Sequence, residues 1–76
     1  MKNHMLKIEA QFLTAVLAGK KPFEIRKNDR GYEVGDLVMM SDGSRWAKGK
    51  IGYITDYAQK PGYVVFSLED ISGGGV

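Results

Sequence analysis

The strongest chemical signal in this sequence is a run of charge between positions 19 and 30. Five of these twelve residues are Lys or Arg, and two are carboxylates. Glu24 and Arg26 are two residues apart in an alternating stretch, so a strand would project both side chains from one face, roughly 6–7 Å apart. A guanidinium and a neighbouring lysine can hold a phosphate, while the carboxylate accepts from a base or fixes the arginine. The stretch therefore indicates an anion or nucleotide site.

We expect the ligand-binding residues to come from this run. They are Lys20, Lys21, Glu24, Arg26 and Arg30. The alternative interpretation is a solvated strand face with an ordinary surface ion pair, which contributes about 0–1 kcal/mol. Convergence of Lys21, Glu24 and Arg26 on one accessible cavity would favour a binding site over that alternative.

Other residues that could do chemistry are scattered. The single histidine, His4, is expected to make a structural hydrogen bond near the first strand. Trp46, Tyr53 and Tyr57 could stack on bases, at about 1–3 kcal/mol per base, but in so small a chain we expect most of these rings to be buried. The sequence contains no pair of catalytic carboxylates, no metal-ligand spacing and no nucleophilic triad. We therefore predict no metal site and no cofactor.

Length and composition exclude several classes of protein. The chain has 76 residues, 43% of them hydrophobic, which is enough for one packed domain and too few for two. It contains no cysteine, so disulfides and thiolate metal sites are excluded. No apolar run approaches the ~20 residues that a membrane-spanning helix needs. A charge at Lys7 interrupts the apolar segment that a secretory signal would need, so the chain is expected to be a cytoplasmic protein with no membrane contact. Its net charge of +2 is only mildly basic.

Hydrophobic spacing predicts one early helix. A short apolar run at residues 5–8 is typical of a first strand. From residue 9 the period changes, and apolar side chains recur with the spacing of one helix face. They are Phe12, Leu13, Val16 and Leu17. Gly19 suits the left-handed position that follows a last helical turn, so we predict a helix over residues 9–18 that packs this face onto the sheet.

A strand is predicted directly after the helix. Pro22 cannot continue a helix but is tolerated where a strand starts. In the alternating run that follows, we expect Phe23 and Ile25 to face the core. Glu24 and Arg26 would then leave the opposite face, beside the lysines at the end of the helix.

The second half of the chain predicts three more strands. The continuously apolar residues 37–40 are typical of a strand buried on both faces. Residues 46–57 predict a long strand, and its internal glycines, Gly49 and Gly52, suggest a bulge or a barrel corner. Residues 63–68 predict the final strand, because a turn rich in Pro and Gly precedes them.

The predicted order is β-α-β-β-β-β, a mostly β (α+β) fold with one helix. Five strands with interior glycines favour a small, partly open β-barrel capped by the helix, and an open α+β sheet is the alternative. We assign residues 1–72 to a single domain and residues 73–76 to a flexible glycine-rich tail. The glycines of this tail lack the preceding strand and following helix of a phosphate-binding loop.

The charged run also carries a resemblance to known proteins. Residues 19–26, Gly-Lys-Lys-Pro-Phe-Glu-Ile-Arg, fit the G-x-K-x-x-E-x-R pattern of the ASCH superfamily, whose fold is PUA-like. The run from 23 to 30 is specific. Together with residues 4–8, 34–36 and 62–65, it is similar to an uncharacterised bacterial and phage family of small PUA-like proteins. The resemblance implies a small β-barrel that binds RNA or a nucleotide-like ligand.

The resemblance and the charge together leave two alternatives open. Some ASCH members hydrolyse the amide of N4-acetylated cytidine with a lysine, a threonine three positions later and a glutamate. Lys21 matches that lysine, but Glu24 occupies the threonine position, so an amidohydrolase would lack its attacking hydroxyl. Pro22 also replaces the small hydroxylic residue that is usual in the family. The other alternative is a phage or bacterial accessory protein that docks on another protein through its basic face.

Overall fold

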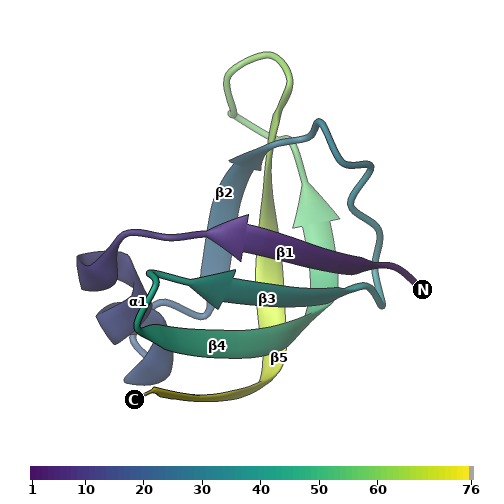
Figure 1. The fold of residues 1–76 in the computed structure, drawn as a ribbon. Coiled ribbons are helices and arrows are strands. Elements are labelled where there is room, and N and C mark those ends of the chain that lie inside the picture. The colour runs from purple at the N-terminus through teal and green to yellow at the C-terminus, as the bar shows by residue number, and fades with distance from the viewer. Residues whose placement is uncertain (76) are drawn as a thin grey trace.

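A computed structural model describes residues 1–75 and confirms the predicted order of one helix and five strands (Figure 1). The elements are β1 (Asn3–Lys7), α1 (Ala10–Leu17), β2 (Phe23–Lys27), β3 (Leu37–Ser41), β4 (Arg45–Thr55) and β5 (Tyr63–Gly75). The five strands form one sheet in the order β1-β3-β4-β5-β2. This sheet curls into a half-barrel, so the fold is mostly β with one helix.

The sheet keeps the first two strands of the chain at its two ends. β1 pairs in parallel with β3, β2 pairs antiparallel with β5, and β3, β4 and β5 form an antiparallel middle. In Figure 1, β1 crosses in front of the half-barrel while β2 rises behind it. Within residues 1–75, β1 and β2 do not pair with each other. We call the gap between their free edges the open side of the half-barrel.

Irregular pairing between β4 and β5 bends the middle of the sheet. The register shifts at two places along β4, which contain Gly49 and Gly52, and this confirms the irregularities predicted from these glycines. At Gly52 a β-carbon would collide with the side chain of Glu69. The Glu69 side chain therefore occupies the space that a larger residue at position 52 would need.

The glycines near the C-terminus belong to the sheet. β5 continues through them to Gly75 and stays paired with β4. A β-carbon on Gly73 would collide with the side chain of Leu17 in α1, so a glycine lets the helix lie directly over the end of β5. The assignment of residues 73–75 to a flexible tail was therefore wrong, and Val76 lies outside the described residues.

The helix begins and ends within one residue of its predicted limits. α1 packs against β4 and β5, buries Leu13 and Val16, and leaves Leu17 partly buried. Phe12, which was expected on the same buried face, is 41% exposed. Gly19 follows the helix with a φ of 77°, as its position predicted. The chain turns there and enters β2.

The core fills the space between α1 and the inner face of the curled sheet. Its buried apolar residues are Leu6, Ile8, Leu13, Val16, Tyr32, Val38, Met40, Ala47, Ile51, Val64, Phe66 and Leu68. β3 was expected to be buried on both faces, but only its inner face, with Val38 and Met40, is fully buried. A half-barrel covers its outer face incompletely. Within residues 1–75, no helix is long and apolar enough to cross a membrane.

Candidate functional site

On the inner face of the sheet, β2 carries a carboxylate. Glu24 is only 3% exposed, whereas Ile25 is 52% exposed and Phe23 is also exposed. The sequence predicted the opposite orientation, with Phe23 and Ile25 toward the core. Alternation separates the two pairs of side chains correctly but does not say which pair points inward. Glu24 can be inward here because its carboxylate finds cations on both sides.

Both oxygens of the Glu24 carboxylate are held by cations. Arg26 donates from Nε to Oε1 over 2.9 Å, and its Nη2 lies 2.8 Å from the same oxygen. Lys21 Nζ donates to Oε2, and also to the backbone carbonyl of Phe23 over 3.0 Å. We call Lys21, Glu24 and Arg26 the charged triad. Two cations and one carboxylate leave it with one net positive charge.

Arg26 also spans the open side. Its Nη2 donates to the carbonyl of Lys7 at the end of β1 over 2.9 Å, so β2 is tied to β1 where the sheet itself is unpaired. Nη1 of Arg26 makes no hydrogen bond to any atom of residues 1–75. Lys21 Nζ can donate three hydrogen bonds and makes two within the same residues. Both cations of the triad therefore keep donors that a ligand can use.

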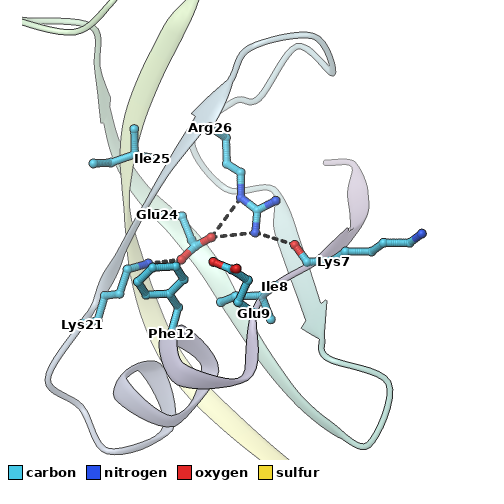
Figure 2. A pocket seen from close by; sticks show the side chains of 8 residues that line it. All are labelled: Lys7, Ile8, Glu9, Phe12, Lys21, Glu24, Ile25 and Arg26. Carbon is cyan, nitrogen blue, oxygen red and sulfur yellow. Dashed lines mark hydrogen bonds and ion pairs between the residues drawn. The ribbon is translucent and has the colours of Figure 1, made fainter.

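The charged triad lines a cavity of about 400 Å³ beside α1, which we call the helix-side cavity (Figure 2). The cavity is lined by Lys7, Ile8, Glu9, Phe12, Lys21, Glu24, Ile25 and Arg26. The Lys21 ammonium lies 5.6 Å from the centre of the Phe12 ring and 5.1 Å from that of Phe23. Both distances are within the range of cation–π attraction. The two rings therefore help to hold the lysine beside Glu24.

Glu9 is a site residue that sequence analysis did not identify. It occupies the N-cap position of α1, but its side chain makes no capping hydrogen bond. Figure 2 shows its carboxylate turned toward the cavity, on the same side as Glu24 and Arg26. The sequence offered one sign of this role. Glutamate is not among the preferred N-cap residues, which are Ser, Thr, Asp and Asn, so its presence at that position was unusual. A carboxylate at this place can accept hydrogen bonds from N–H or hydroxyl groups of a ligand.

A second cavity, of about 340 Å³, lies on the other side of the contact between Arg26 and Lys7. We call it the turn-side cavity, because its wall continues from β2 into the following turn. It is lined by Met5, Leu6, Lys7, Arg26, Lys27, Asp29, Arg30 and Tyr32. Lys7 and Arg26 line both cavities. The two cavities are therefore neighbours along the open side.

The structure distributes the five expected site residues unequally. Lys21, Glu24 and Arg26 meet in the helix-side cavity. Arg30 lines the turn-side cavity instead. Lys20 is exposed and lines neither cavity.

The chain matches a family that has no assigned function. Residues 3–68 match the family described as a domain of unknown function, DUF3850. The chain belongs to this family. The matched segment contains every residue that lines the two cavities.

A phage protein is similar to part of this DUF3850 domain. The "Uncharacterized 12.9 kDa protein in GpA 3'region" of Escherichia phage P2 is 42% identical over 48 residues. The aligned segment covers 63% of this chain and 41% of the phage protein. The DUF3850 chain thus spans less than half the length of that relative.

The DUF3850 domain buries a second carboxylate, outside the two cavities. Asp36 is 1% exposed and accepts backbone N–H groups of Lys2 at 2.9 Å and Glu33 at 3.0 Å. His4 Nε2 lies 2.8 Å from its Oδ2. Burial raises the pKa of Asp36, but the hydrogen bonds from His4 and the two backbone groups outweigh it and lower the pKa to about 2. The expected structural hydrogen bond of His4 near the first strand is confirmed.

Three aromatic residues that were expected to be mostly buried lie on the surface of the DUF3850 domain. Trp46, Tyr53 and Tyr57 are all exposed, and none of them lines either cavity. The expectation was wrong because the core is filled by aliphatic side chains with Tyr32 and Phe66. For the candidate site, Phe12 is the aromatic residue that matters.

Proposed function

We propose that this domain binds RNA or a nucleotide-like ligand in the helix-side cavity, with the charged triad as its floor. The observation that carries the proposal is a buried carboxylate that fixes two cations with donors to spare beside a cavity. An ion pair sealed in the protein interior would leave no donor beside a cavity. Here Nη1 of Arg26 is unpaired within residues 1–75, and Arg26 lines the cavity.

The charge of the triad suits an anionic ligand. A guanidinium and an ammonium both donate charge-assisted hydrogen bonds to phosphate oxygens. Glu24 then holds Lys21 and Arg26 in place and does not itself need to touch the phosphate. Glu9 adds an acceptor for a base N–H or a ribose hydroxyl, groups that an inorganic anion lacks. This combination favours a nucleotide over a simple anion.

The size and the apolar lining of the cavity suit one nucleoside. Small-ligand cavities typically measure about 300–1,000 Å³, and this one measures about 400 Å³. Ile8 and the exposed ring of Phe12 provide an apolar wall. A base stacked on an aromatic ring is stabilised by about 1–3 kcal/mol. Phe12 is therefore the candidate stacking residue.

The resemblance to the ASCH superfamily supports the same proposal, because Lys21, Glu24 and Arg26 are residues of its sequence pattern. The amidohydrolase alternative has less support. Among residues 1–75, no hydroxyl or thiol side chain lines the helix-side cavity, and Lys21 already donates to Glu24. Docking on a protein partner has no specific contact in its favour.

Equilibrium binding to nucleosides, short single-stranded RNAs and tRNA tests the proposal. We expect at least one of these ligands to bind, and RNA binding to weaken linearly with the logarithm of the salt concentration. Arg26→Ala should reduce the affinity about tenfold or more, since a hydrogen bond to a charged group contributes about 1.5–3 kcal/mol. It should also reduce the salt slope. Lys50→Ala is the matched control, because Lys50 is exposed on β4 and lines neither cavity.

Two further measurements distinguish a loss of binding from a loss of folding. Arg26→Ala also removes the contact to Lys7, so its unfolding must be compared with wild type. Arg26→Lys keeps the charge but loses the planar set of donors, and it should bind with intermediate affinity. The proposal is contradicted if no nucleoside or RNA binds, or if folded Arg26→Ala binds like wild type. Lys2→Ala would not serve as a control, because the Lys2 ammonium donates to the carbonyl of Gly31 beside the turn-side cavity.

A further inference from the structure

The turn-side cavity carries positive charge in addition to that of the charged triad. Besides Lys7, its cations are Arg26, Lys27 and Arg30, and its one carboxylate is Asp29. The side chains of Lys27 and Arg30 are exposed and make no hydrogen bond or ion pair within residues 1–75. Their charge is thus not neutralised inside the protein.

A buried tyrosine adds a polar group at a fixed position in this cavity. Tyr32 is 6% exposed, and its ring centre lies 4.7 Å from that of His4 and 4.9 Å from that of Phe66. Its hydroxyl makes no hydrogen bond within residues 1–75. Every fully buried side-chain nitrogen or oxygen of these residues has a partner, so the hydroxyl must be reached by solvent, and Tyr32 lines the turn-side cavity.

The Tyr32 hydroxyl has the right protonation state to donate to an anion. Burial raises its pKa, while the charges of Arg26 and Arg30 act in the opposite direction without reversing the shift. The hydroxyl is therefore protonated at neutral pH and can donate one hydrogen bond. Tyr32 lines the same cavity as the cations Arg26, Lys27 and Arg30.

We infer that the turn-side cavity is a phosphate subsite, where the Tyr32 hydroxyl, Arg30 and Lys27 act together with Arg26 of the charged triad to hold the phosphate attached to a nucleoside in the helix-side cavity. Arg26 lines both cavities, so this residue lies where nucleoside and phosphate would join. The inference rests on the proposed function and extends it from a nucleoside to a phosphorylated unit. That unit is either a free nucleotide or one link of an RNA chain.

The test compares each nucleoside with its 5′- and 3′-monophosphates and with a short single-stranded RNA, by NMR titration. The ratio of the nucleoside Kd to the monophosphate Kd measures the contribution of the phosphate. In the wild-type protein we expect this ratio to be about ten or more, because the phosphate gains charge-assisted hydrogen bonds. Tighter binding of the RNA than of either monophosphate would identify an RNA link as the ligand, and equal binding would identify a free nucleotide.

Two variants assign that ratio to the turn-side cavity. Tyr32→Phe keeps the ring that packs on His4 and Phe66 and removes only the hydroxyl, and Arg30→Ala changes an exposed residue. Each should lower the ratio several-fold and leave the nucleoside Kd unchanged, whereas Lys50→Ala should change neither quantity. A wild-type ratio near one, or a ratio unchanged in both variants, would overturn the phosphate subsite and leave the nucleoside pocket standing.

Inorganic phosphate separates failure of this inference from failure of the proposed function. If nucleosides do not bind but inorganic phosphate does, and Tyr32→Phe weakens it, the subsite stands and the nucleoside pocket is wrong. If neither nucleosides, nucleotides nor phosphate bind, both proposals are wrong.

Discussion

Two carboxylates are buried in this domain, and their partners differ in kind. Asp36 is held by a histidine ring and by two backbone N–H groups. Glu24 is held by Lys21 and Arg26, two long side chains that line a cavity and keep unused donors. Backbone amides that satisfy a buried acid are committed to the fold, whereas cations beside a cavity can be shared with a ligand. Burial alone therefore does not identify a functional carboxylate, and the nature of its partners does.

The largest effect should come from removing the Asp36 carboxylate. Asp36→Ala leaves His4 and the backbone N–H groups of Lys2 and Glu33 without their acceptor. We expect the free energy of unfolding to fall by about 3–5 kcal/mol, a large part of the roughly 4–11 kcal/mol typical of a chain of this length. Chemical denaturation measures the change. A loss below about 1 kcal/mol would show that these contacts are dispensable and would remove the contrast with Glu24.

A smaller effect of the same carboxylate should appear in acid. The pKa of Asp36 is about 2 in the folded protein, below its ordinary value of 3.8, so the unfolded chain binds this proton more readily. The resulting stabilisation is present above about pH 4 and is lost as the pH falls from about 4 to about 2. Denaturation of wild type and Asp36→Asn across this range should show the stability difference shrinking. A difference that stays constant down to pH 2 would contradict the lowered pKa.

The smallest effect on stability should come from Glu24→Gln. The amide keeps the shape of the side chain, and both cations can turn to water in the cavities, so we expect a loss of about 0.5–1.5 kcal/mol. Affinity for the ligand of the helix-side cavity should fall more, because Lys21 and Arg26 lose the charge that positions them. Unfolding and binding should be measured on the same samples. If stability falls as far as in Asp36→Ala while binding is unchanged, Glu24 is a structural carboxylate like Asp36.

The element order could be predicted because it depends on local spacing. The apolar period and Gly19 located α1 to within one residue, and Gly49 and Gly52 marked the irregular pairing of β4. The length of β5 could not be predicted in this way. Gly73 is a glycine because Leu17 of α1 lies against it, and a contact between residues so distant in the chain leaves no local pattern.

Three residues of the candidate site, Lys21, Glu24 and Arg26, could be predicted from the sequence, but the direction in which Glu24 and Arg26 point could not. Alternation correctly placed Glu24 and Arg26 on one face of β2. The rule that apolar side chains face inward then predicted, wrongly, that this face points outward. The choice depends in part on the carbonyl of Lys7, which comes from a more distant part of the chain. Glu9 was missed because it lies at the start of the helix, outside the charged run from which the site residues were expected.

β1 and β2 are the first two strands of the chain, yet they stand at opposite ends of the sheet. The contact between them therefore depends on strands that come later in the chain. β1 needs β3 as its partner, and β2 needs β5. The contact of Arg26 with Lys7 across the open side can therefore form only after the final strand has docked. Contacts between distant segments cost loop-closure entropy before they stabilise the chain. Both cavities thus depend on the complete sheet, because β2, which contributes to both, is held in place by β5.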